Sequence, residues 1–391
     1  MRELSHLLGG IPASVTLAVN DKAKALQRAG HDVIALAGGD PDFDTPYHIV
    51  EAAKAALEAG HTHYPAPTKG IPELLEAIAA KMVNENGVYV EPRTDIIVTP
   101  GSKWALYLAL GALINPGDEI LYFEPVWVSY PPMIRLNGGT PVPVSLDPAD
   151  NFAITEERIR AMISPRTKAL MVNSPSNPTG RMLTDAEARA ITKVAIQEDL
   201  YVITDEVYEK LAFDGREHIS LAAQPGMGER TLTTNGLSKG YAMTGWRLGW
   251  LAGPTPIMKL AGKLHGQAVT SAATFTMVAA IAALQGEQAV VEEMRASYQR
   301  RRDFMVAALN EMPGIECATT DGAFYLLPRF TETERDSLEL ADFLLEEAGI
   351  AATPGIAFGS SAAGHLRFSI ATAQRELERA AERLAEIAPR L

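Results

Sequence analysis

The sequence contains a single cysteine among its 391 residues, and this scarcity limits what the chain can be. One thiol cannot form an internal disulfide or a cysteine-rich metal cage. Such cysteine usage is typical of a reducing compartment, so we expect a cytoplasmic protein. Cys317 has no recognisable motif around it, and we expect it to behave as a small buried hydrophobe.

Positive charge and long apolar runs are also scarce. The chain has 35 Lys and Arg against 48 Asp and Glu, a formal net charge of −13. This balance argues against electrostatic binding to nucleic acid or to an anionic membrane surface. The longest apolar stretch, residues 269–284, is interrupted by Thr and Ser and is too short to span a bilayer, so we expect a core helix there. The N-terminal residues lack the uninterrupted apolar core of a signal peptide.

Short apolar runs alternate with helical periods between residues 95 and 252. The sequence Thr184-Asp-Ala-Glu187 is a capping box that predicts the start of a helix over 186–198. This alternation favours a doubly wound α/β fold with a mainly parallel sheet, in which ligands bind at the carboxyl ends of the strands. We predict strands at 96–99, 119–123, 140–145, 169–173, 201–204, 231–233 and 248–252.

Outside this region the pattern differs. Residues 20–29 predict a short helix and 32–37 a short strand, followed by a glycine- and proline-rich loop in which the backbone can approach a ligand. A long charged helix is expected over 291–309. It contains Arg300-Arg-Arg-Asp303, which we interpret as a solvated face.

The stretch from Asn235 to Arg247 is the most informative part of the chain. It sets Lys239 directly after Ser238 among small residues. A lysine performs covalent carbonyl chemistry when its amine is held near a carbonyl and kept deprotonated often enough to attack. A serine hydroxyl and an arginine fork suit a phosphate, and a reactive lysine beside a phosphate site indicates pyridoxal 5'-phosphate (PLP). The alternative for this stretch alone is a solvated lysine and a surface arginine.

Three further windows carry related chemistry. Gly101-Ser102-Lys103 ends a strand and opens a helix, whose free amides could bind a phosphate or could form an ordinary turn. Asp205 ends an apolar strand, where a carboxylate is costly unless it meets a cation such as a protonated pyridine nitrogen; a helix-capping role is the alternative. Arg367 lies inside an apolar strand and requires a carboxylate partner.

Together these windows closely resemble the class I aminotransferases of PLP fold type I, in the family's order and over nearly the whole chain. The bacterial aspartate and aspartate/prephenate aminotransferases are the subgroup that it resembles most. The resemblance implies an α/β fold with a large domain, residues 48–290, built on a mainly parallel seven-stranded sheet. A smaller α+β domain would follow at 291–391, and residues 1–47 would pack with it.

The resemblance also implies roles for individual residues. Lys239 would bind PLP covalently and move a proton as general base and acid. Asp205 would hold the ring nitrogen, Tyr208 and Asn177 would bond the phenolate oxygen, and Trp127 would stack on the ring and face the substrate. The phosphate would be held by Gly101, Ser102, Lys103, Ser238, Arg247 and, from a neighbouring subunit of a homodimer, Tyr64. The substrate carboxylate would meet Gly39, Asn177 and Arg367, and a distal carboxylate would meet Ser14, Thr16 and Lys103.

The implied reaction moves an α-amino group between an amino acid and a 2-oxo acid, with aspartate and 2-oxoglutarate favoured. The chain has Ile11-Pro12-Ala13 where members of the subgroup often have Lys-Pro-Ser, which leaves prephenate open. Aromatic, neutral and basic donors remain alternatives, as do elimination, decarboxylation or an oxidative side reaction on the same scaffold. The scaffold also occurs in transcription regulators, but these need an added DNA-binding domain.

Overall fold

The computed structural model describes residues 3–13 and 15–391 and is centred on a seven-stranded sheet of order β2-β8-β7-β6-β5-β3-β4. All strands run parallel to their neighbours except β8, which is antiparallel to both β2 and β7. All seven predicted strands are present, with small differences at their ends. Their bounds are β2 Ile96–Thr99, β3 Glu119–Glu124, β4 Thr140–Ser145, β5 Thr167–Asn173, β6 Tyr201–Asp205, β7 Thr231–Gly236 and β8 Gly249–Ala252.

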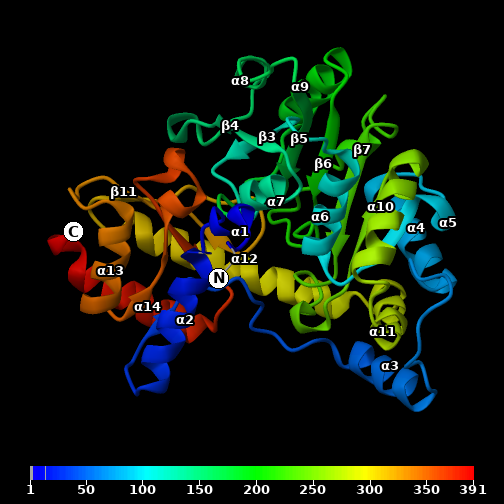
Figure 1. The fold of residues 1–391 in the computed structure, drawn as a ribbon. Coiled ribbons are helices and arrows are strands. Elements are labelled where there is room, and N and C mark those ends of the chain that lie inside the picture. The colour runs from blue at the N-terminus through cyan, green and yellow to red at the C-terminus, as the bar shows by residue number, and fades with distance from the viewer. Residues whose placement is uncertain (1–2, 14) are drawn as a thin grey trace.

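Helices cover both faces of this sheet (Figure 1). Because successive side chains of a strand point to opposite faces, Ile120 of β3 joins the core under α6, α7 and α10, whereas Leu121 joins the core under α8 and α9. The predicted capping box at the start of α9 is confirmed. The covering helices are α6 Ser102–Leu113, α7 Tyr130–Leu136, α8 Glu156–Arg160, α9 Asp185–Gln197 and α10 Thr255–Ala268.

A third core lies beside β2 and β8, where α3, α4 and α11 pack together. These helices span α3 Tyr47–Glu58, α4 Pro72–Asn86 and α11 Thr274–Gln285. Two short helices, α1 His6–Gly9 and α5 Pro92–Asp95, lie elsewhere in the N-terminal part of the sequence. The apolar stretch 269–284 was predicted as one core helix. The structure corrects its start, because 269–273 is non-helical and α11 begins only at Thr274.

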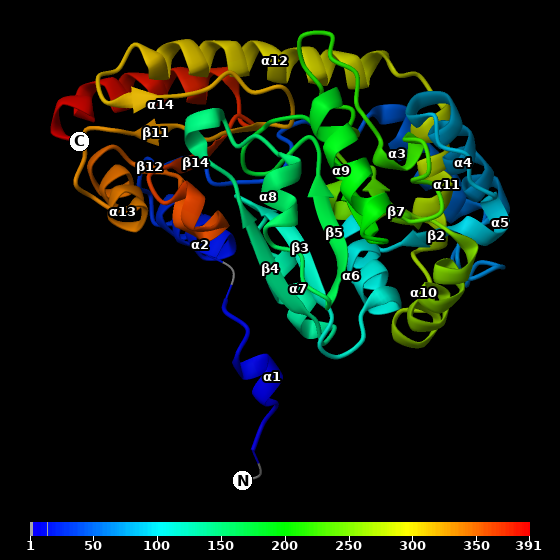
Figure 2. The same ribbon diagram turned by 90° about the horizontal axis from the view of Figure 1, so that it is seen from above.

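The C-terminal part packs helices around short strands. One small sheet contains three strands, β10 Tyr325–Leu326, β14 Leu366–Ser369 and β13 Thr353–Pro354. Two further pairs are β9 Ile315–Glu316 with β11 Arg329–Phe330, and β1 Ile34–Ala35 with β12 Ile350–Ala351. The predicted strand at 32–37 is therefore shorter and lies outside the main sheet. The helices are α2 Val15–Arg28, α12 Ala289–Asn310, α13 Ser337–Glu347 and α14 Gln374–Ile387. Figure 2 shows α12 running from the side of α4 and α11 to the side of α14.

Two expectations about α12 and its surroundings have opposite outcomes. The arginine run 300–302 is not a uniformly solvated face, because Arg301 and Arg302 are only 7% and 1% exposed and pair with carboxylates from distant segments. Cys317 is buried, as predicted, and burial raises the pKa of its thiol to about 12.

Among the described residues, none of the helices taken singly has the length and apolar composition of a membrane span; α11 and α12, bent by 77° at their junction, reach that combination only as a pair.

Candidate active site

A cavity of about 440 Å³ opens at the carboxyl ends of β5, β6 and β7 and gathers most of the residues singled out in the sequence. Gly101 lies next to it, against Arg247. Tyr64 does not line it and is 80% exposed, and Ser14 falls outside the described residues. The predicted residues lining the cavity are Thr16, Gly39, Ser102, Lys103, Trp127, Asn177, Asp205, Tyr208, Ser238, Lys239, Arg247 and Arg367.

Lys239 enters this cavity from the segment that follows β7. Its amine donates a hydrogen bond to the carbonyl of Gly39 and lies 5.6 Å from the centre of the Phe324 ring. Loss of hydration lowers the pKa of Lys239 to about 8, although the negative charge of Asp40 acts in the opposite direction. Near neutral pH, a useful fraction of this amine is therefore uncharged and able to act as a nucleophile or base.

Asp205 sits at the end of β6 and is 5% exposed. One of its oxygens accepts a hydrogen bond of 2.8 Å from the Tyr130 hydroxyl, and the other lies 3.4 Å from the backbone nitrogen of Val207. Burial raises the pKa of Asp205 to about 6, which means that the ionised carboxylate is less stable here than in water. Such a group suits a cationic partner, and a protonated pyridine nitrogen fits this requirement.

Arg367 projects from β14 and is 3% exposed. Its guanidinium donates to the side-chain oxygen of Asn177 at 3.0 Å and to the carbonyl of Ala37 at 2.7 Å. Its Nε is buried without a partner, and burial lowers the pKa of the group. A buried arginine with an unused donor is suited to a carboxylate ligand.

Two tyrosines that were not predicted from the sequence contact predicted site residues: Tyr325 contacts Tyr208, and Tyr130 contacts Asp205. The hydroxyl of Tyr325 lies 3.0 Å from that of Tyr208, and a Cβ placed on Gly39 would come within 2.7 Å of the Tyr325 oxygen. The rings of Tyr130 and Trp127 meet edge to face, with their centres 5.6 Å apart. In the sequence Tyr130 stands three residues after Trp127, a helical spacing that could have identified both.

The opposite end of the cavity is suited to an anion. Gly101 has a φ of +89° as the N-cap of α6 and offers no side chain to cap it, so the amides of Ser102 and Lys103 at the start of the helix are suited to an anion. A side chain at Gly101 would overlap the guanidinium of Arg247, which donates to the carbonyl of Thr244 at 3.0 Å. Partial burial, and then the proximity of Arg247, lower the pKa of Lys103.

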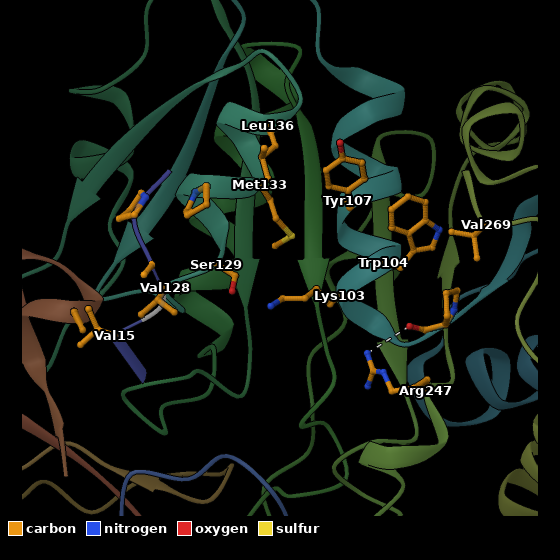
Figure 3. Close-up of a pocket in the computed structure, with 15 residues that line it drawn as sticks. Val15, Lys103, Trp104, Tyr107, Val128, Ser129, Met133, Leu136, Arg247 and Val269 are labelled. Atoms are coloured by element: carbon orange, nitrogen blue, oxygen red, sulfur yellow. Dashed lines mark hydrogen bonds between the residues drawn. The ribbon is translucent and has the colours of Figure 1, made fainter. Parts of the chain in front are cut away.

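A second cavity of about 590 Å³ adjoins the first and shares Lys103 and Arg247 with it. Its walls are mainly apolar, and Figure 3 shows Trp104 and Tyr107 projecting from α6 toward it. The ammonium of Lys103 lies 4.9 Å from the centre of the Trp127 ring. The first cavity is thus polar and charged, while its neighbour is apolar.

The chain belongs to the aminotransferase class I and II family, whose model matches residues 31–384. It is 44% identical to the aspartate/prephenate aminotransferase of Thermus thermophilus across 99% of each chain, and 41% identical to the aspartate aminotransferase of Geobacillus stearothermophilus across 98% of each. The solved structure of Thermus thermophilus aspartate aminotransferase with maleate has a TM-score of 0.94 and 43% identity, covering 99% of this chain and 100% of that one.

An aromatic aminotransferase from Pyrococcus horikoshii is also similar, with a TM-score of 0.89 and 42% identity over 94% of this chain and 99% of that one. These findings confirm the predicted family, the fold type I architecture and the class of enzyme, an aminotransferase. The roles of the individual site residues stay predictions.

Proposed function

We propose that this aminotransferase uses PLP to move an α-amino group between an amino acid and a 2-oxo acid, with aspartate and 2-oxoglutarate as the favoured pair. The observation that supports this most is a lysine amine with a pKa of about 8 in the same cavity as a buried carboxylate and a buried arginine. The cavity offers a separate charged group for each ionised part of the cofactor and substrate.

The residues present fit the cofactor. When bound, PLP would supply a carbonyl carbon for Lys239 and an electron sink for the bond that breaks at the substrate Cα. The phosphate would be held by the α6 amides, Ser238 and Arg247. Asp205 would hold the ring nitrogen, because a cation there offsets the cost of its buried charge. Tyr208 and Asn177 would bond the phenolate oxygen, and Trp127 would stack on the ring.

Lys239 would also carry the proton that the reaction moves. Its neutral amine would accept the proton from the substrate Cα, and the resulting ammonium would act as the acid that gives the proton back. A pKa near the operating pH makes both directions accessible. The carbonyl of Gly39 limits where the amine can point.

Arg367 and Asn177 would bind the substrate α-carboxylate, with Gly39 against it. At the other end, Lys103 and Thr16 are suited to a distal carboxylate; the resemblance assigns the same role to Ser14, which lies outside the described residues. The apolar cavity beside Lys103 favours aromatic amino acids as a second class of donor. An enzyme of this kind would place a carboxylate on Lys103 or an aromatic ring among Trp104 and Tyr107.

We further propose a homodimer in which Tyr64 reaches the phosphate of the partner's cofactor. The support is that Tyr64 is a large exposed side chain, and that the backbone beside it is fixed by a hydrogen bond of 2.6 Å from the Thr274 hydroxyl to the carbonyl of His63. We also propose the three-part division at residues 47 and 290, since Ile34 and Leu36 pack in the same core as α12, α13 and α14.

Absorption spectroscopy of the purified protein with PLP tests the reaction. With aspartate, the cofactor band should convert to that of the amine form and return on adding 2-oxoglutarate. Lys239→Ala should show no such cycle. Release of ammonia or hydrogen peroxide from an amino acid without any 2-oxo acid would instead establish elimination or oxidation and overturn the proposal.

A further inference from the structure

Residues 37–42 form a backbone segment that contacts both Lys239 and Arg367 in the catalytic cavity. The carbonyl of Ala37 accepts a hydrogen bond from Arg367, and the carbonyl of Gly39 accepts one from Lys239. The carboxylate of Asp40 opposes the fall in the Lys239 pKa. The position of this short segment therefore sets the surroundings of both the amine and the guanidinium.

Arg301 of α12 holds the far end of this segment. Its Nη1 donates to Asp42 at 2.7 Å and lies 3.3 Å from the carbonyl of Ile370, the residue that follows β14. One buried guanidinium thus contacts the segment that carries Gly39 and the strand end that carries Arg367. Because its side chain is only 8% exposed, the pairing is shielded from water and stronger than a surface ion pair.

Aromatic packing connects the same arginine to the catalytic lysine. The guanidinium lies 5.0 Å from the ring centre of Phe43 and 5.3 Å from that of Tyr298. Tyr298 packs against Phe324 at 5.5 Å, and the amine of Lys239 lies over the Phe324 ring. Arg301 therefore supports the site through a polar contact and through a continuous series of packed rings.

From the other side, the segment is tied to the chain that follows Lys239. The hydroxyl of Thr244 donates to Asp40 at 2.5 Å, and the hydroxyl of Thr45 donates to the carbonyl of Ala242 at 2.7 Å. The segment is thus fixed between the sheet side of the cavity and α12. Loss of the α12 attachment would release the Asp42 end of the segment, while the contacts of Ala37, Gly39 and Asp40 would remain.

We propose that Arg301 is a positioning residue of this aminotransferase: by holding Asp42 and the Ile370 carbonyl together, it sets the placement of Gly39 and Arg367 for the substrate carboxylate. The proposal rests on the function given above, in which these two residues bind that carboxylate. It assigns a role in substrate binding to a residue that does not touch the substrate.

The neighbouring Arg302 provides a matched control on the same helix. It is 1% exposed, donates to Asp214 at 2.8 and 2.9 Å, and donates to the carbonyl of Thr320. Neither partner lines the catalytic cavity. Replacing Arg302 therefore removes an arginine–aspartate pair of the same type but leaves the contacts of residues 37–42 in place.

Steady-state kinetics of Arg301→Met and Arg302→Met test the proposal. We expect Arg301→Met to raise KM for the amino donor about tenfold with kcat within about threefold, because the lost interaction serves substrate binding, whereas the backbone of Lys239 follows β7 and lies outside residues 37–42. Arg302→Met should change KM less than about twofold. Arg301→Lys should fall in between, since lysine keeps the positive charge that pairs with Asp42 but lacks the planar guanidinium that lies over the Phe43 and Tyr298 rings.

Hydrogen exchange provides a readout that does not need turnover. The amides of residues 36–45 should exchange about tenfold faster in Arg301→Met than in the parent or in Arg302→Met. If Arg301→Met does not fold, Asp42→Ala removes the acceptor of the same pair from the loop side and should give the same two changes. An unchanged KM with unchanged exchange in either variant, or an equal KM rise in Arg302→Met, would overturn the proposal. A parent protein that transfers no amino group would instead refute the proposed function, and exchange alone would then decide whether Arg301 holds the segment.

Discussion

The two sides of the catalytic cavity are built in different ways. On the sheet side, Asp205 and Lys239 follow buried strands of five and six residues in one continuous sheet. On the other side, Gly39 and Arg367 belong to a loop and a four-residue strand held by contacts such as Arg301 to Asp42, which joins residues 259 positions apart. The sheet side depends on local pattern, whereas the substrate side depends on individual long-range pairs. Removing single side chains should therefore affect the two sides differently.

The largest effect is expected on the sheet side, from Lys239→Ala. Because this change removes both the nucleophile and the proton carrier, kcat for amino transfer should fall by about 10⁴-fold or more. Stopped-flow or coupled assays measure the rate. Lys259→Ala on α10 is the control, because it removes one positive charge as well but leaves the cavity intact. Residual activity within tenfold of the parent would assign the chemistry to another group.

Asp205→Asn separates catalysis from stability. In the cofactor-free protein the folded pKa of about 6 exceeds the unfolded value near 3.9, so the stability due to this group is present below pH 4 and lost as pH rises through 6. The ionised carboxylate then destabilises the fold by up to about 3 kcal/mol at pH 8. Asp205→Asn should therefore raise the apoprotein Tm at pH 8 but not at pH 4, while lowering amino transfer about 100-fold or more. An equal Tm change at both pH values would contradict this account.

On the substrate side, Arg367→Lys should raise KM for every amino donor by about 100-fold with a smaller change in kcat. Lysine keeps the charge but loses the fork that spans Asn177, Ala37 and a carboxylate. Comparing aspartate with an aromatic donor serves as the control, because both carry the same α-carboxylate. A KM rise confined to aspartate would place Arg367 at the distal carboxylate instead.

The smallest effect concerns the charge of Asp40. In the cofactor-free protein, labelling of Lys239 by an amine-reactive reagent should rise with pH around 8, far below an ordinary lysine. Since Asp40 raises the pKa of that amine, Asp40→Asn should move the midpoint to lower pH. Peptide mass spectrometry measures the labelling, and Lys259 provides an exposed reference in the same sample. A midpoint that rises in Asp40→Asn would show that the carboxylate acts mainly through Thr244.

The same difference explains what the sequence could predict. The seven strands could be predicted because each is an apolar run between stretches of helical periodicity. Asp205 could be singled out because it ends such a run, whereas Asn177 was assigned from the resemblance to the family; both line the cavity. Arg301 and Arg302 were misread because a charged run on a helix is usually solvated, and their carboxylate partners lie far away in the sequence. The contact of Tyr130 with Asp205 and that of Tyr325 with Tyr208 also arise only when distant segments meet.

The burial of Cys317 has a practical consequence. This thiol follows β9 in the C-terminal part, and the backbone amide and carbonyl of Cys317 are both hydrogen-bonded to the side chain of Asn310 at the end of α12. With a pKa of about 12, it is almost entirely in the unreactive thiol form at physiological pH. Cys317 is therefore a natural probe of local unfolding. The rate at which a thiol reagent modifies the native protein reports how often the region around α12 opens, without any added label.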